Sequence, residues 1–428
     1  MHTSHKAFTL IELLVVIAII AILSVVVVLT LNPVELLRQS RDSNRLSDMT
    51  TLNSALSLYS TDQSSASSFN MGSSSVIYVS IPDPAATSTA GSNCASLDLP
   101  TPPAMYSYHC AASSTFRNTN GQGWIPVNFS AISSGSPIGN LPVDPVNQSS
   151  SRLFYTYTTN GSQYEGTSVM ESAKYGVGGS NDVISGDGGT LASVFEKGSK
   201  LGLEPLDYGD PSLVGYWSMS EGTGTVAYDY SGNNASGTWS GSTTNGSYYT
   251  TNARIGSYAG SFNGSTTYIG YGTNNPIFQF GMGSFSIAGW FYGTSGSGLS
   301  PIFGVAQGAN GSRYALNYQG GGSLQAFVYD GTNLVAPGSS SGLANQWVDA
   351  VMVVNRTTNV LSLYVDGILN VSSSITSITG NLSPQGQAVS SNCVNSCGGY
   401  FGGSIEDVRV YSRALSATQI AAMYAGGK

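Results

Sequence analysis

The chain has 428 residues, which is too long for one ordinary domain and predicts about two or three. Its formal net charge is −8. Because binding to nucleic acid needs clustered Lys and Arg, this charge balance excludes a nucleic-acid partner. Only 9% of the residues are charged, far below the ~25% of an average soluble protein. With 53 glycines and with Ser, Thr and Asn supplying the polarity, the composition favours β-rich, loop-rich domains outside the cell.

An almost unbroken apolar run extends from Leu13 to Leu31 and is interrupted only by Ser24 and Thr30. At about 1.5 Å of rise per residue, it is close to the ~20 residues that cross ~30 Å of hydrocarbon. In lipid the backbone polar groups must be satisfied within the segment, so a membrane-spanning helix is predicted over residues 8–31. Lys6 ahead of the run favours a cytoplasmic leader. The run is longer than a signal-peptide h-region and lacks an A-x-A site, so we expect it to be retained.

One charge, Glu12, lies at the mouth of this run, where a lone carboxylate is costly. Around it, the segment Lys6–Leu14 reads KAFTLIELL and resembles the processing motif of type IV pilins and type II secretion pseudopilins. The resemblance covers Lys6–Tyr59. It implies that residues 1–7 are a leader, that a prepilin peptidase cleaves between Ala7 and Phe8, and that Phe8 is then N-methylated. The family usually has Gly where Ala7 stands.

The same resemblance gives Glu12 a role in filament assembly, in which it pairs with the freed amine of Phe8 on a neighbouring subunit. A buried carboxylate is tolerated when an ammonium compensates it. The implied partners are the prepilin peptidase, other pilin subunits that dock through the N-terminal helix, and the inner membrane. The implied location is the cytoplasmic membrane, crossed once, and after assembly the cell surface or an extracellular filament. The alternative is an ordinary membrane anchor with a chance Glu.

A second helical length is predicted over Val34–Ser60, because Asn32-Pro33 ends or kinks the first helix. Its apolar residues recur at spacings of three and four, which predicts one buried stripe formed by Met49, Leu52, Leu56 and Tyr59. Its charged residues are spaced to pair along the exposed side, namely Arg38 with Asp42 and Arg45 with Asp48. In pilins this segment continues the spine helix and packs against the globular head.

Residues 32–197 are assigned to the rest of the spine helix and a small pilin-like α+β head. A strand is expected at Val76–Ile81. The two-residue turn signal Asn160-Gly161 predicts a hairpin between Leu153–Tyr157 and Gln163–Glu171. This Tyr-rich hairpin follows a Pro-x-Asp-Pro loop, an order that resembles the sheet of the pseudopilin head.

The four cysteines form two pairs by spacing, Cys94 with Cys110 and Cys393 with Cys397. In an exported chain, disulfides are the default interpretation of such pairs. A zinc site is disfavoured, because His109 is the only nearby nitrogen ligand.

A linker is predicted at residues 198–212, where Gly and Pro occur without periodicity, and a second domain at 213–428. From Leu213 onward the pattern is all β, with short alternating runs and turns such as Asp330-Gly331 and Asp366-Gly367. Strands at such spacing predict an antiparallel sandwich. Ser416 and Gln419 form a capping box that predicts a short C-terminal helix.

The second domain resembles the LamG-like jelly rolls of the concanavalin A-like superfamily over Leu213–Tyr424. The segments that carry the resemblance are Leu213–Gly222, Asp229–Asn233, Ser286–Trp290, Leu363–Gly367 and Gly403–Ser416. The expected fold class is therefore multidomain, α+β and all-β: a long N-terminal transmembrane and spine helix with a small pilin-like head, followed by an antiparallel β-sandwich. The resemblance implies carbohydrate, protein or calcium as ligands.

Calcium is the only cofactor candidate, and the sequence marks its ligands weakly. Asp229 and Asp407 lie in the family's motifs and offer the hard oxygen ligands that calcium prefers, although capping of turns is the favoured interpretation. The same holds for Asp182 and Asp187 in the head, which could echo the calcium loop of some pseudopilin relatives.

Tryptophans could offer platforms for sugar rings. Core packing is favoured for Trp290 and Trp347, which lie in strand patterns. Trp239 and the Tyr248-Tyr249 loop are the better surface candidates.

No catalytic residue is predicted, and the chain is expected not to be an enzyme. Glycoside hydrolysis generally needs two facing carboxylates. Adjacent residues such as Glu406 and Asp407 point to opposite faces of a strand. The favoured function is a surface-exposed filament subunit that displays the sandwich as an adhesin module for glycan or protein ligands. The alternative is a pseudopilin whose sandwich selects exported substrates, and a surface glycanase is disfavoured.

Overall fold

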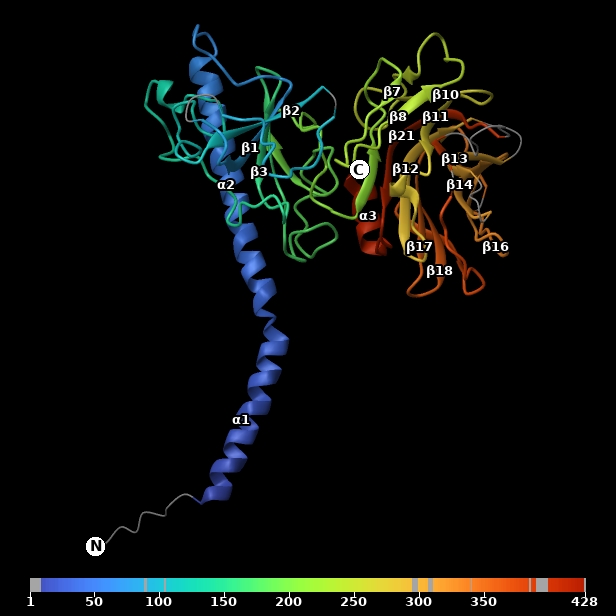
Figure 1. The fold of residues 1–428 in the computed structure, drawn as a ribbon, viewed down its shortest axis with the longest axis horizontal. Coiled ribbons are helices and arrows are strands. Elements are labelled where there is room, and N and C mark those ends of the chain that lie inside the picture. The colour runs from blue at the N-terminus through green and yellow to red at the C-terminus, as the bar shows by residue number, and fades with distance from the viewer. Residues whose placement is uncertain are drawn as a thin grey trace.

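The computed structural model describes residues 9–87, 91–103, 105–294, 299–306, 311–339, 341–384, 386–389 and 399–426. Four residues with predicted roles lie outside these ranges: Ala7, Phe8, Cys393 and Cys397. Figure 1 shows a long helical rod that leaves a globular body made of two parts, the head and the sandwich. The predicted fold class is confirmed, with one long N-terminal helical arm, an α+β head and an all-β sandwich.

Two helices form the rod, α1 (Leu10–Leu31) and α2 (Pro33–Gln63). They meet at Asn32, whose left-handed backbone (φ 39°) interrupts the helix immediately before Pro33, as predicted. Across the ranges given above, no helix satisfies both the length and the apolarity needed to cross a membrane. The described side chains of residues 10–24 are exposed, and Figure 1 shows α1 projecting away from the globular body.

The head is a five-stranded sheet packed on α2. Its strand order is β2-β1-β3-β4-β5, with β1 and β2 parallel and the other pairs antiparallel. The predicted stripe Met49, Leu52, Leu56 and Tyr59 is buried against one face of this sheet. The predicted hairpin is present, but four residues, 160–163, connect its strands. The strands are β1 (Val76–Asp83), β2 (Ser107–Ala112), β3 (Tyr155–Thr159), β4 (Tyr164–Ser168) and β5 (Phe195–Gly198).

The sandwich consists of two antiparallel sheets of eight strands each that enclose one apolar core. The first runs β19-β18-β17-β12-β21-β10-β9, with β6 also paired to β21. Its strands are β6 (Leu213–Trp217), β9 (Tyr249–Thr250), β10 (Ala259–Asn263), β12 (Phe285–Gly293), β17 (Trp347–Asn355), β18 (Val360–Val365), β19 (Ile368–Ser374) and β21 (Gly402–Tyr411).

The second sheet runs β16-β15-β14-β13-β20-β11-β8-β7. Its strands are β7 (Val226–Ala227), β8 (Gly237–Ser240), β11 (Tyr268–Thr273), β13 (Leu299–Ala306), β14 (Arg313–Gln319), β15 (Ser323–Tyr329), β16 (Leu334–Val335) and β20 (Gly386–Val389). The C-terminal helix α3 (Ala417–Gly426) follows β21. Its predicted capping box is present: Ser416 N–H donates to Gln419 Oε1 (3.1 Å), and Gln419 N–H donates to Ser416 Oγ (3.2 Å).

A second apolar core, here called the junction core, joins the head to the sandwich. Ile77 and Val79 of β1 belong to it, as do Val351 and Val353 of β17. Because side chains alternate across a strand, β17 packs into the sandwich with Ala350, Met352 and Val354 and against the junction core with the residues between them. Residues of the predicted linker also belong to the junction core, with Leu206 and Tyr208 each 1% exposed. The chain is therefore packed, not extended, where it passes from head to sandwich.

Ile420 of α3 is fully buried in the junction core, so its truncation tests whether head and sandwich are stabilised together. We expect Ile420→Ala to lower the free energy of unfolding by about 2–5 kcal/mol, because it leaves a cavity. The measurement is denaturant unfolding followed by near-UV circular dichroism. Ile368→Ala, at a side chain that is 73% exposed, is the control and should change the free energy by no more than about 0.5 kcal/mol. Separate head and sandwich transitions, with only one shifted, would contradict a shared core.

Candidate functional site

Glu12 lies at the exposed start of α1, where it forms a capping box with Thr9. Its Oε2 accepts the Thr9 N–H (2.9 Å) and the Thr9 hydroxyl (2.7 Å), while Glu12 N–H donates to Thr9 Oγ1 (3.3 Å). The carboxylate is thus held by its own helix and remains exposed. Its position leaves it accessible to a cation brought by another molecule.

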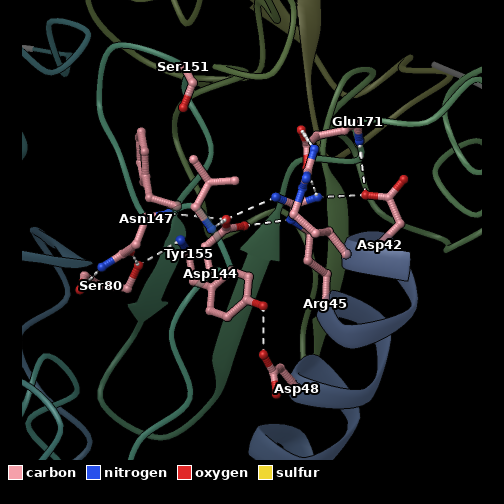
Figure 2. Close-up of polar contacts among 12 residues, drawn as sticks. Asp42, Arg45, Asp48, Ser80, Asp144, Asn147, Ser151, Tyr155 and Glu171 are labelled. Atoms are coloured by element: carbon pink, nitrogen blue, oxygen red, sulfur yellow. Dashed lines mark hydrogen bonds and ion pairs between the residues drawn. The ribbon is translucent and has the colours of Figure 1, made fainter. Parts of the chain in front are cut away.

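The spine helix is fixed to the head by a buried arginine, which sequence reasoning placed differently. Arg45 is 0% exposed, and Figure 2 shows its guanidinium pointing from α2 into a group of carboxylates. Its Nε and Nη2 donate to both oxygens of Asp144 (2.6 and 2.9 Å), and its Nη1 donates to Asp42 and Glu171 (both 2.7 Å). Arg41 adds a second pair of hydrogen bonds to Glu171 (2.7 and 2.8 Å).

The predicted ion pairs along an exposed side of this helix are therefore wrong. Asp42 and Arg45 are buried, and they pair with each other and with loops of the head. Asp48 accepts the hydroxyl of Tyr155 (2.8 Å), as Figure 2 shows, and not a bond from Arg45. The reason is that Asp144, the aspartate of the Pro-x-Asp-Pro loop, occupies the guanidinium from a position 99 residues away. The helical spacing carries no information about such a partner.

Charge neutralisation in this cluster depends on the arginines. Burial alone raises the pKa of Glu171, but hydrogen bonds from Arg41 and Arg45 outweigh it and leave the pKa below its ordinary value. A carboxylate with a lowered pKa stabilises the folded state above its unfolded pKa, and this stabilisation is lost as the pH falls. The cluster thus requires the arginine charge.

Arg45→Met keeps much of the side-chain volume but leaves buried carboxylates without a cation. We expect the free energy of unfolding to fall by about 3–5 kcal/mol, because an uncompensated buried charge remains. Thermal unfolding at pH 7 measures the loss. The matched control is Arg38→Met, on the exposed side of the same helix, which should cost no more than about 0.5 kcal/mol. Equal effects of the two substitutions would show that the cluster does not fix the helix.

The remaining predicted site residues lie at structural positions. Cys94 and Cys110 form a disulfide that ties the loop before β2 to that strand. Asp229 accepts three backbone N–H groups, from Tyr216 (3.0 Å), Ser231 (2.9 Å) and Ala235 (2.9 Å), so it caps a loop.

Asp407 accepts a hydrogen bond from Arg409 Nη2 (2.7 Å), and burial raises its pKa to about 6. In the head, Asp182 and Asp187 accept backbone N–H groups of their own turns. No group of three or more His, Cys, Asp or Glu suited to a metal ion occurs within the described ranges.

The aromatic candidates are mostly buried. Trp239 is 3% exposed and Tyr249 is 6% exposed, so these two surface candidates are buried. Trp239 points from β8 into the core between the two sheets, and its Nε1 donates to the Tyr249 hydroxyl (3.0 Å). Tyr248 is half-buried and stacks on Trp239. Trp290 is buried beneath Tyr424 and the guanidinium of Arg254.

Neighbouring carboxylates of β21 have different partners. Glu406 accepts the backbone N–H groups of Arg254 (2.7 Å) and Ile255 (2.8 Å), and burial raises its pKa to about 8. Asp407 pairs with Arg409. The carboxylates of Glu406 and Asp407 therefore bind separate protein groups and do not face each other across a shared site.

A cavity of about 340 Å³ opens where the head meets the sandwich, and no sequence motif predicts it. Its wall on the head side includes Tyr106 and residues 200–205, and its wall on the sandwich side includes Ser218, Ser220 and Asp407. We call it the junction cleft. Tyr106 and Asp407 lie about 100 and 200 positions away from residues 200–220, so the complete lining forms only in the folded chain.

Glu204 lies in the wall of the junction cleft and is almost fully buried. Burial raises its pKa to about 8, although hydrogen bonds from Thr156 and Leu206 oppose the shift. The folded chain therefore retains a proton on Glu204 at pH values where the unfolded chain has lost it.

This difference predicts how stability changes with pH. Between the ordinary pKa of about 4.5 and about 8, Glu204 should lower stability as pH rises, by up to about 1.4 kcal/mol per pH unit. Glu204→Gln cannot ionise, so its melting temperature should fall less between pH 5 and pH 8 than that of the wild type. Differential scanning calorimetry across that range measures the slopes. Parallel curves for the two proteins would refute the buried, protonated state.

Comparison with family models finds two matches. Residues 263–421 match the concanavalin A-like lectin/glucanases superfamily, and residues 3–28 match the prokaryotic N-terminal methylation motif. No curated protein sequence matches the chain.

Several solved structures resemble about half of this chain at low sequence identity. Domain 4 of AbnA, a GH43 extracellular arabinanase from Geobacillus stearothermophilus, in complex with arabinotriose, is 18% identical, with a TM-score of 0.38, covering 49% of this chain and 97% of that one. The botulinum neurotoxin serotype G binding domain is 15% identical, with a TM-score of 0.39, covering 50% of each chain. Trypanosoma rangeli sialidase is 16% identical, with a TM-score of 0.40, covering 50% of this chain and 33% of the sialidase.

Proposed function

We propose that this chain, in which a prokaryotic N-terminal methylation motif precedes a concanavalin A-like domain, is a surface filament subunit that displays its sandwich as a binding module. The observation that carries the proposal is the state of α1. Its side chains from Leu10 to Leu23 are apolar except Glu12, and they are exposed. A contiguous apolar surface of this kind marks an interaction with lipid or with other protein chains.

The two kinds of contact follow one another in the proposed sequence of events. The apolar run first holds the chain in the cytoplasmic membrane while a prepilin peptidase cleaves between Ala7 and Phe8. The same surface then packs against α1 of other subunits. Packing removes Glu12 from water, and the amine of Phe8 on the neighbouring subunit supplies the compensating charge.

The globular body is proposed to act by binding and not by catalysis. The methylation motif and the lectin-like domain support this reading. Within the described part of the sandwich, Glu406 and Asp407 are each engaged by separate protein groups. A glycan or protein ligand outside the cell is the proposed partner of the sandwich, and the cell surface is the proposed final location.

The test is Glu12→Gln, which keeps the shape and the helix start, because Gln also serves in a capping box. The variant should reach the membrane and be cleaved, and N-terminal mass spectrometry should find methylated Phe8 in it as in the wild type. Filament assembly should fail, because the buried ammonium would cost about 3–5 kcal/mol without its anion. That is roughly a hundredfold to several-thousandfold in an assembly equilibrium.

Sheared-surface fractions and membrane fractions are compared by immunoblot. Glu35→Gln is the matched control, because Glu35 occupies the same third position of α2 that Glu12 occupies in α1. It should assemble normally. Normal assembly of Glu12→Gln would remove the pairing mechanism, and a mature chain that begins at Met1 would remove the proposed processing.

A further inference from the structure

The junction cleft belongs to neither part of the body alone. Tyr106 and residues 200–205 come from the head side, while Tyr216, Tyr230 and Asp407 come from the sandwich. Figure 1 shows the two parts side by side along this boundary. A volume of about 340 Å³ falls at the lower end of the roughly 300–1,000 Å³ of small-molecule sites.

The walls of the cleft are held in place by the junction core. Tyr216 is 4% exposed and belongs to that core, together with Leu206 and Leu213. The phenol of Tyr230 packs against Tyr216, with ring centroids 5.8 Å apart. Because both walls share this packing, the cleft is preformed and a ligand would not have to order it on binding.

The lining combines aromatic rings with hydroxyl groups. Tyr106 and Tyr230 are half-buried, so part of each ring faces the cleft. Ser218 and Ser220 contribute hydroxyls that bond to each other (2.9 Å). An apolar ring with polar groups beside it suits a ligand that has an apolar C–H face and a rim of hydroxyls.

A buried cation lies behind this lining. Arg409 is 0% exposed and stacks over the ring of Tyr216 (4.5 Å). Its Nη2 donates to Asp407 (2.7 Å) and to the Thr190 carbonyl (3.3 Å). Tyr216, Asp407 and Thr190, the three residues that Arg409 contacts here, line the cleft. Within the described structure, Nε and Nη1 of Arg409 have no protein acceptor. Buried donors of this kind usually have a partner, and an ordered water would provide one.

The charges of the lining largely cancel. The Lys, Glu and Asp residues that line the cleft are Lys200, Glu204 and Asp407. Asp407 is neutralised by Arg409. Burial raises the pKa of Glu204 to about 8, so this side chain is mostly protonated at pH 7. The cleft thus lacks the cluster of cations that would select a strongly acidic ligand.

We propose that the junction cleft binds a neutral saccharide unit, with Tyr106 and Tyr230 against the sugar ring and Ser218 and Ser220 toward its hydroxyls. The inference rests on the proposed function and names the site and ligand class of its binding module. Assembly through α1 does not depend on it.

The test measures sugar binding by full-length protein in a detergent without a sugar headgroup. The probes are the methyl α-glycosides of glucose, galactose and mannose, with the methyl glycoside of N-acetylneuraminic acid as the acidic comparison. Saturation-transfer NMR detects binding, and isothermal titration calorimetry gives the Kd. We expect at least one neutral probe to bind, and the acidic probe to bind more weakly.

Three variants locate the site. Ser220→Trp and Ser257→Trp place bulk at exposed positions of the lining, and Tyr106→Ala removes a ring from the head wall. Each should raise the Kd about tenfold or more. The thermal transitions of the two serine variants should stay close to that of the wild type, whereas Tyr106→Ala also loses packing against the junction core. Tyr248→Ala is the matched control, because Tyr248 is also half-buried but stacks on Trp239 away from the cleft. It should leave the Kd unchanged.

Several results would overturn the inference. These are no binding of any neutral probe by the wild type, preference for the acidic probe, or unchanged Kd in folded Ser220→Trp and Ser257→Trp. Loss of binding in Tyr248→Ala alone would move the site to the surface around Tyr248. Each of these outcomes leaves the Glu12→Gln assembly test unaffected, so failure of the cleft is distinguishable from failure of the filament proposal.

Discussion

The globular body depends on an apolar sheet face that needs a cover. The side chains of strand β17 point alternately into two cores: Met352 faces the interior of the sandwich, and Val351 and Val353 face the head. Exposed valines on a flat sheet would cost free energy in water. The head sheet, the chain near Leu206 and α3 cover this face. Head and sandwich are therefore one body, and the junction cleft is a consequence of how they meet.

The spine helix shows the opposite arrangement. Along α2 the apolar stripe is covered by the head, and Arg45 is locked by carboxylates from distant loops. Along α1 the apolar side chains between Leu10 and Leu23 are exposed. The break at Asn32 separates these two regions. The chain thus presents an apolar rod and, on its body, a cleft lined by polar and aromatic side chains.

Sequence patterns predicted what short-range physics determines. The break at Pro33, the stripe from Met49 to Tyr59 and the capping box at Ser416 follow from local geometry, and all are present. Alternation also predicted the sandwich strands. Long-range partners could not be predicted in this way. Helical spacing predicted that Arg45 pairs with Asp48, but Arg45 pairs instead with Asp144, which lies in a distant loop. The sequence around Trp239 does not show which face of β8 is covered. The composition of residues 198–212 does not reveal that Leu206 and Tyr208 are buried in the junction core.

The most direct measurement of the central claim is immunogold electron microscopy of surface filaments, with an antibody raised against the sandwich. If the chain is a subunit whose α1 lies in the filament and whose body faces outward, gold particles should lie along filaments or at their tips. They should disappear in cells that lack the gene. Unlabelled filaments beside a labelled cell envelope would contradict the account, because the chain would then remain in the membrane.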